Sequence, residues 1–278
     1  MGRTKLRLAK TMFAIGAGIL PSSAHAQLRP DPIFVQYTRY DGSTSSVEGG
    51  LGPPPLKIGR LFWVNSLSGR ALRLDLGSRI ADTTKLAFGS VLRISLDARS
   101  SLSIGGSLAF RTADDGVQLS SRTAFGTGLL FYSRSFGSNE RSRWFAGLVL
   151  PDRSGSLFIL PAVGFEYVTP SEDWQVVVGW PGSAVSYGPT DRSRIGILTL
   201  FEGASYARST NQTYLRSERL VSAFSLKQAL YRGLSGQLRL GRTWKGRSFE
   251  QNSEFERIRT YKDSAGLYLS VGLSQRFD

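Results

Sequence analysis

The chain has 278 residues, with 35 Lys and Arg, 21 Asp and Glu, one His and no Cys. The one His, His25, lies in a segment that we expect to be removed, so the remaining chain has neither imidazole nor thiol. Zinc sites, haem ligation through His, disulfides and nucleophile pairs built on His or Cys all need these side chains. Composition therefore excludes most familiar enzyme chemistries from the mature protein.

The first 26 residues have the three parts of a secretory signal peptide. A basic start precedes an uncharged apolar run over 11–20, and Ala24 and Ala26 form an A-x-A cleavage site that makes Gln27 the first mature residue. A spanning helix needs about 20 apolar residues and this run is half as long, so a membrane anchor is the weaker alternative. The basic side chains of this segment are Arg3, Lys5, Arg7 and Lys10.

The remainder, 27–278, shows no composition break and is expected to form one domain. It keeps 31 basic and 21 acidic side chains, a net charge of +10. From about residue 32, apolar residues recur at every second position, a spacing typical of strands that face two environments. In 84–97, for example, one face carries Leu86, Phe88, Leu92, Ile94 and Leu96.

This pattern predicts an all-β fold, a closed antiparallel transmembrane β-barrel of about twelve strands. The range is ten to fourteen, because 71–77 and 184–189 are the weakest strand candidates. Short turns on one rim would alternate with long loops on the other. The short turns are 98–100, 169–173, 191–193 and 232–233, and the long polar segments are 41–55, 208–216 and 246–262.

The residues opposite the apolar face favour a membrane barrel over a soluble domain. They are mostly Gly, Ser and Ala with scattered Arg and Tyr, which suits a lumen, while Leu, Ile, Phe and Val would contact lipid. The alternative, a secreted or periplasmic β-sandwich or lipocalin-like binding module, would turn its Leu and Phe face inward. Aromatic residues near the expected strand ends would lie at headgroup level: Trp144, Trp174, Trp180, Trp244, Tyr37 and Tyr40.

The last segment, 265–277, alternates strictly, and Phe277 is followed by one residue, Asp278. With Gly272 and Phe277, it resembles the terminal assembly signal of Gram-negative outer-membrane β-barrel proteins. The segment 160–203 looks like that of uncharacterised single-barrel families of unknown function. The resemblance implies a location in the cell outer membrane, insertion by the barrel-assembly machinery, and contact with outer-membrane lipid and lipopolysaccharide.

No catalytic, metal or cofactor site is predicted. Outer-membrane phospholipases, acylases and omptin-like proteases resemble one another in needing a catalytic His. The pair Asp114 and Asp115 precedes Gly116 and is interpreted as a turn, and the glycines of 126–128 do not precede a helix as a phosphate loop requires. Export and the lack of a Lys/Arg run also exclude nucleic acid as a partner.

The function expected is therefore a passive pore with anion preference, or a structural surface protein. When strand residues are sorted by face, eleven basic side chains against three acidic ones fall on the lumen side, the latter being Asp75, Asp97 and Glu166. A positive lining would concentrate anions. The main candidates for lumen charges are Arg73, Arg93, Arg111, Arg122, Lys227 and Arg239.

If the terminal segment is an assembly signal, removal of Phe277 and Asp278 lowers the amount of folded protein in the outer membrane. Removal of Asp278 alone is the matched control and leaves that amount unchanged or higher, because Phe277 is then the last residue. Quantitation of the heat-modifiable form in outer-membrane fractions measures both. A larger loss from the Asp278 deletion than from the double deletion would show that Phe277 is not part of the signal.

Overall fold

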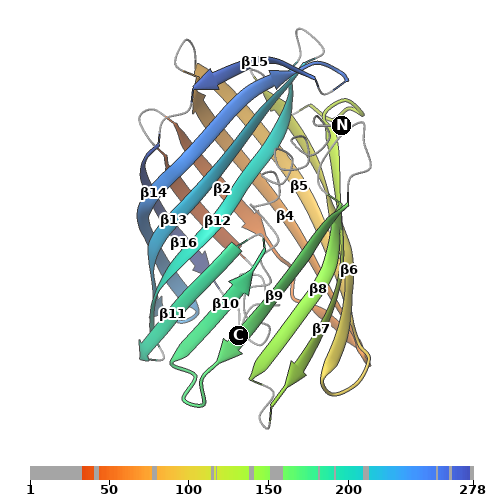
Figure 1. Cartoon of the computed structure of the whole chain (residues 1–278), viewed down its shortest axis with the longest axis vertical. Coiled ribbons are helices and arrows are strands. Elements are labelled where there is room, and N and C mark those ends of the chain that lie inside the picture. Colours follow the sequence, from red (N-terminus) through yellow and green to blue (C-terminus); the bar gives the residue numbers. More distant parts are fainter. Residues whose placement is uncertain are drawn as a thin grey trace, which may run out of the picture.

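The computed structural model describes residues 33–275 apart from 41–43, 77–79, 114–115, 117, 138–140, 151–158, 181, 191, 209–212, 255 and 263–264. The regular elements of this part of the chain are sixteen strands (Figure 1). None of the described residues forms a helix long and apolar enough to cross a membrane. The strands are β1 (Ile33–Arg39), β2 (Ser45–Leu51), β3 (Leu56–Ile58), β4 (Leu61–Asp75), β5 (Ile80–Ser95), β6 (Ser100–Ala113), β7 (Ala124–Phe136), β8 (Ser142–Leu150), β9 (Leu160–Val168), β10 (Trp174–Gly179), β11 (Gly182–Thr190), β12 (Ser193–Arg208), β13 (Tyr214–Tyr231), β14 (Leu234–Gln251), β15 (Arg257–Lys262) and β16 (Gly266–Gln275).

Fourteen of these strands close into one antiparallel ring. Neighbours in the chain pair along β1, β2 and β4 to β14, and β16 joins β14 to β1. Of the two strands outside the ring, β3 pairs with β4 and β15 pairs with β14. The prediction of a closed antiparallel β-barrel is confirmed, with a strand number at the upper limit of the expected range.

The structure has more strands than the expected twelve because Gly and Ser hide the alternation in some of them. Both weak candidates are strands, since 71–77 overlaps β4 and 184–189 lies inside β11. The predicted loop 41–55 contains all of β2, whose sequence SSVEGGL has few apolar residues. Most of 246–262 likewise belongs to β14 and β15. Both polar segments therefore contain strand and are not continuous long loops.

The strands present two faces, as the alternation requires. In β1, the exposed Val35 and Tyr37 alternate with the less exposed Gln36 and Thr38, and the same pattern runs through most of the ring strands. In β13, residues 215–219 are buried on both faces. Residues that are paired on neighbouring strands point to the same side of the sheet, so each face continues from strand to strand around the ring. We call the exposed, mainly apolar set the outer face and the other set the lumen face.

The two rims differ. We call the rim at which β1 begins and β16 ends the turn rim; the connections 59–60, 96–99, 169–173 and 232–233 lie there. In the last of these, both Arg232 (φ 35°) and Gly233 (φ 78°) have positive φ, as a tight two-residue hairpin needs. We call the opposite rim, where β4, β6 and β12 end, the loop rim. The predicted short turns 98–100, 169–173 and 232–233 are confirmed on the turn rim, and residue 191 of the turn 191–193 lies outside the described residues.

The barrel narrows toward the loop rim. Strands β7 to β11 have 6 to 13 residues, whereas β12 to β14 have 16 to 18. Beyond the short strands, β12 pairs directly with β6 through Ala207 with Thr112 and Arg208 with Ala113. This pairing closes a second ring of nine strands. Strand direction alternates around the ring, and since nine is an odd number, β6 and β12 meet with the same direction and pair in parallel. We call it the narrow ring.

A cluster of buried apolar side chains fills the narrow ring. Its members come from β4, β5, β6, β12, β13, β15 and β16 or from the segments next to these strands and β1, and β7 to β11 contribute none. A ring of about eight strands is just wide enough for its own side chains to fill. The cluster, which we call the apolar plug, consists of Tyr40, Leu72, Leu74, Leu76, Ala81, Ala113, Leu200, Tyr206, Leu215, Val221, Ala223, Tyr261 and Tyr268.

A ring in which each strand is paired on both edges resists dissociation by detergent, because no free edge exists at which unfolding can start. We therefore expect the folded protein to migrate on a denaturing gel at a different position before and after boiling. A sample unfolded in urea and left unboiled serves as the control and should match the boiled one. Identical mobility of folded and boiled samples would contradict the closed barrel.

Candidate functional site

The lumen face carries an excess of positive charge. Among the described strands, nine basic and three acidic side chains alternate with the exposed apolar set and so face inward. A further ion pair, Arg208 with Glu250, lies at the loop rim and adds no net charge. The basic residues are Arg70, Lys85, Arg93, Arg111, Arg143, Arg194, Arg219, Lys227 and Arg239, and the acidic ones are Glu48, Glu166 and Glu202.

Tyr40 connects opposite walls of the barrel next to the apolar plug. Its hydroxyl accepts a hydrogen bond from Arg70 Nη2 at 2.8 Å and donates one to Glu202 Oε2 at 2.6 Å. The guanidinium of Arg219 lies 4.4 Å from the centre of the Tyr40 ring, and the Tyr268 ring packs at 5.7 Å. With 3% of its surface exposed, Tyr40 holds charges from β4, β12 and β13 in one network across the lumen.

The turn between β1 and β2 holds Tyr40 in this place. The Tyr40 amide donates to the carbonyl of Thr44 at 2.9 Å, which closes the turn. The Thr44 hydroxyl oxygen accepts a hydrogen bond from the Asp75 amide at 3.0 Å, which fixes the turn to the end of β4. Tyr40 also continues the lumen-face series of Gln36 and Thr38, so its side chain points into the lumen.

A second polar network follows the lumen wall formed by the short strands. Arg143 on β8 pairs with Glu166 on β9 at 2.5 Å, and both side chains are at most 10% exposed. Gln175 on β10 donates to the same carboxylate at 2.8 Å, and Arg194 on β12 reaches Gln175 at 3.5 Å and Ser186 at 3.3 Å. Glu166 therefore neutralises Arg143, while Arg194 donates to neutral side-chain oxygens.

The structure places four of the six predicted lumen charges on the lumen face: Arg93, Arg111, Lys227 and Arg239. Arg73 instead lies on the outer face, where its side chain is 56% exposed and Nε is 4.0 Å from Asp82. Arg122 is in the turn before β7 and donates to the carbonyl of Arg208.

The error at Arg73 has a physical reason. The prediction rests on apolar residues facing lipid, but Leu72, Leu74 and Leu76 point into the apolar plug, which puts their neighbours Arg73 and Asp75 outside. The prediction of Tyr40 at headgroup level is wrong for a similar reason, since this residue is buried.

Sequence reasoning also missed several lumen charges. Some lie in strands whose alternation is weak, while strict alternation within β8 would have found Arg143. The missed residues are Arg70, Arg143, Arg194, Glu48 and Glu202.

The remaining predicted residues give no test of their roles. Ala24, Ala26, Gln27 and Phe277 lie outside the described residues. Gly272 faces the lumen in β16, between Gln36 and Gln237 of the neighbouring strands. Among the predicted interface aromatics, Trp144 and Trp174 are exposed on the outer face and pack on Tyr132 and Tyr187.

Comparison with known proteins finds similar solved structures but no matching family. No family model matches the chain, and no curated protein matches it. The NanC porin aligns over 88% of this chain and 100% of its own, with 10% identity and a TM-score of 0.43. The KdgM porin, solved with disordered oligogalacturonate, aligns over 88% and 99% with 8% identity and a TM-score of 0.41. The β domain of the Bordetella autotransporter BrkA aligns over 88% and 97%, with 12% identity and a TM-score of 0.26.

Replacement of Tyr40 by Phe removes the hydroxyl that connects Arg70 with Glu202 and leaves both charges without that partner. Hydrogen bonds to charged groups are worth about 2 kcal/mol each, so we expect Tyr40→Phe to lower the free energy of unfolding by at least about 2 kcal/mol. Tyr37→Phe, a change on the exposed outer face, is the matched control and should have little effect. Urea unfolding in detergent micelles measures both, and equal stabilities would contradict the network.

Proposed function

We propose that this chain is an integral outer-membrane pore that prefers anions. The observation that carries the proposal is the positive lumen face inside a ring whose outer face is apolar. A positive lining in a wall of low dielectric constant concentrates anions and repels cations. The mature chain, without His or Cys, acts here as a channel and not as an enzyme.

The outer face supports the membrane part of the proposal. Large apolar side chains are highly exposed around the ring, among them Val35 (56%), Phe88 (53%), Val163 (60%), Ile197 (64%) and Leu267 (62%). In water such a surface would cause aggregation, while in a bilayer it contacts acyl chains. A soluble lipocalin-like module would show the reverse arrangement.

Paired aromatic rings near the turn rim support the same orientation. Their centroids lie 4.8 to 5.8 Å apart on the outer faces of β7 to β11. Such rings prefer the boundary between hydrocarbon and headgroups. The pairs are Tyr132 with Trp144, Phe136 with Phe165, and Trp174 with Tyr187.

The preference for anions would come from the half of the lumen near the turn rim. Arg93 donates to the Ser101 hydroxyl at 3.0 Å, and Arg194 donates to neutral groups, so neither charge is cancelled by an acid through these contacts. Lys227 lies beside Arg194 in the register of β12 and β13. These three side chains form the part of the lining that we expect to attract anions.

The apolar plug and the Tyr40 network fill the narrow ring, so we propose that the pore is closed at rest near the loop rim. Passage of ions then requires the Tyr40 side chain and the apolar plug to move out of the ion path. We also propose that the outer face contacts lipopolysaccharide and that the barrel-assembly machinery inserts the chain.

We expect reversal potentials in planar bilayers under a salt gradient to give a chloride to potassium permeability ratio above about 3. Wild type and a Tyr40→Ala variant, which lacks the side chain that crosses the lumen, are both recorded. Replacing Arg93, Arg194 and Lys227 with Gln should bring the ratio toward 1. The matched control replaces the same number of outer-face arginines, Arg73, Arg134 and Arg242, and should leave the ratio unchanged.

Two outcomes would overturn this function. Cation selectivity of either protein would contradict the charge argument. Absence of conductance from both folded wild type and Tyr40→Ala would contradict the pore itself.

A further inference from the structure

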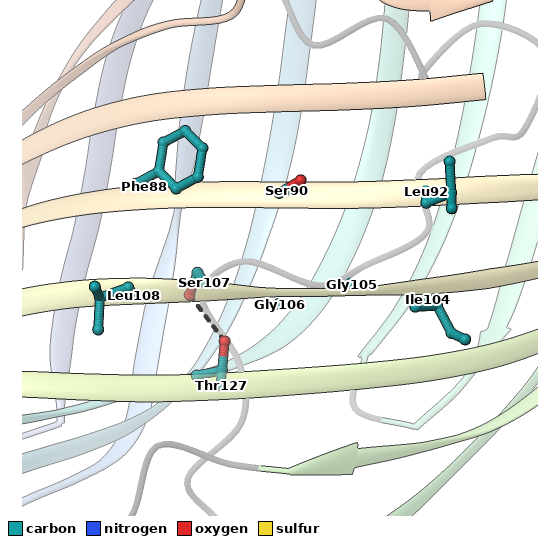
Figure 2. A pocket seen from close by; sticks show the side chains of 9 residues that line it. All are labelled: Phe88, Ser90, Leu92, Ile104, Gly105, Gly106, Ser107, Leu108 and Thr127. Atoms are coloured by element: carbon teal, nitrogen blue, oxygen red, sulfur yellow. Dashed lines mark hydrogen bonds between the residues drawn. The ribbon is translucent and has the colours of Figure 1, made fainter. Parts of the chain in front are cut away.

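The wall formed by β5, β6 and β7 has a groove of about 460 Å³ that the pore does not use. Figure 2 shows that Phe88 and Leu108 lie at one end of it and Leu92 and Ile104 at the other. All four belong to the outer face, so the groove opens toward the side that we assign to lipid.

A row of small residues makes the hollow. Ser90, Gly106 and Gly128 are paired side by side across the three strands. A Cβ atom on Gly106 would lie 2.3 Å from the carbonyl oxygen of Thr127, so no larger residue fits there without moving the backbone. Between flanking Phe and Leu side chains, this row leaves space for a slender apolar group.

The indole of Trp63 on β4 lies next to the groove. Its Nε1 donates to the Ser90 hydroxyl at 2.8 Å, which satisfies the polar atom that would otherwise face lipid. Trp63 itself is 43% exposed. The Ser90 hydroxyl therefore has a hydrogen-bond partner and does not need one from a ligand in the groove. Trp63 also places a fluorescent side chain beside the groove.

Three arginines lie at the turn rim of the same strands. Arg60 precedes β4, Arg99 is in the turn between β5 and β6, and Arg134 is on the outer face of β7. Backbone hydrogen bonds tie two of them to this corner: the Ser95 amide donates to the Arg60 carbonyl at 3.0 Å, and the Ser135 amide donates to the Arg99 carbonyl at 2.7 Å.

Among the described residues of this corner the acid is Asp97, and its carboxylate is directed to the turn. It accepts hydrogen bonds from the Ser100 hydroxyl at 2.5 Å and from the amides of Arg99 and Ser100 at 2.7 Å. These bonds, the Ser100 hydroxyl foremost, hold the pKa of the carboxyl below its usual value. Among the described residues of this corner, three arginines therefore stand against one acid.

The spacing between this corner and the groove fits half a bilayer. Six residues separate Ser100, which pairs with Arg134, from Gly106. At about 3.4 Å per residue this is roughly 20 Å along the strand, or about 14 Å of depth at a tilt of 45°. The hydrocarbon of one leaflet is about 15 Å thick.

We propose that the groove binds an acyl chain of an anionic phospholipid from the leaflet at the turn rim, with Arg99 and Arg134 holding its phosphate. The inference rests on the proposed membrane location but not on conduction. A second copy of the chain is the less suitable occupant, because a two-fold contact here would bring the arginine clusters of both copies together at a cost.

Trp63 reports on the occupant. In a variant that keeps Trp63 alone, with Trp144, Trp174, Trp180 and Trp244 replaced by Phe, fluorescence is measured in bilayers of phosphatidylcholine containing brominated phosphatidylglycerol. The same mole fraction of brominated phosphatidylcholine is the lipid control. We expect the brominated phosphatidylglycerol to quench Trp63 more strongly, and its apparent affinity to fall about fivefold for each of Arg99 and Arg134 replaced by Gln. Arg192→Gln, at the same rim beside β12, should change nothing.

A variant that keeps Trp174 alone separates the possible failures. Equal quenching of Trp63 by both lipids would overturn the phospholipid site and leave the membrane location standing. Quenching of Trp174 but not of Trp63 would show that a second copy or another protein covers the groove. No quenching of either residue would overturn the membrane location on which the inference depends.

Filling the groove is the complementary test. Ser90→Leu should reduce the phosphatidylglycerol retained by the purified barrel in native mass spectrometry by about one molecule per chain. Ser222→Leu is the matched control, because Ser222 is also an outer-face serine bonded to its neighbour, Thr199, at 2.9 Å. Equal retention in the two variants would contradict the site.

Discussion

Closure of the backbone hydrogen-bond ring is the constraint on which the rest of this structure depends. In a bilayer, an unpaired strand edge leaves N–H and C=O groups without water, at a cost of several kcal/mol each. The pairing of β1 with β16 removes the last edges by joining the two ends of the described chain. Once the ring is closed, the period of two along each strand divides the described side chains between the outer face and the lumen face.

The second ring is a consequence of unequal strand lengths. Because β7 to β11 stop early, the upper parts of β6 and β12 would have unpaired edges if they did not meet. Their short parallel ladder satisfies those edges, and it reduces the circumference from fourteen strands to nine. A ring of that size has room for side chains only, so the same device that completes the hydrogen bonding also produces the apolar plug.

The lumen charges have different partners in the narrow part and in the wide part of the barrel. In and below the narrow ring, where water is excluded, Arg70 and Arg219 are held with Glu202 around one tyrosine, as buried charges require. In the wider part, Arg93 donates to a serine hydroxyl, and Arg194 donates to hydroxyl and carbonyl oxygens that carry no charge. The wide part of the lumen therefore holds positive charge that these contacts do not compensate.

The sequence by itself determined the all-β class, the closed antiparallel ring and the short turns of one rim, because a period of two and tight-turn residues are local properties. It also placed Arg93, Arg111, Lys227 and Arg239 inward, since they lie in strands with regular alternation. It could not decide that Leu72 and Leu74 face inward or that Tyr40 crosses the lumen. Those positions depend on the meeting of β6 with β12, which are about 95 residues apart between Thr112 and Ala207 and carry no local signal of their pairing. Only the tertiary structure shows where the interior of the barrel changes from water to packed side chains, and that change decides which face an apolar residue prefers.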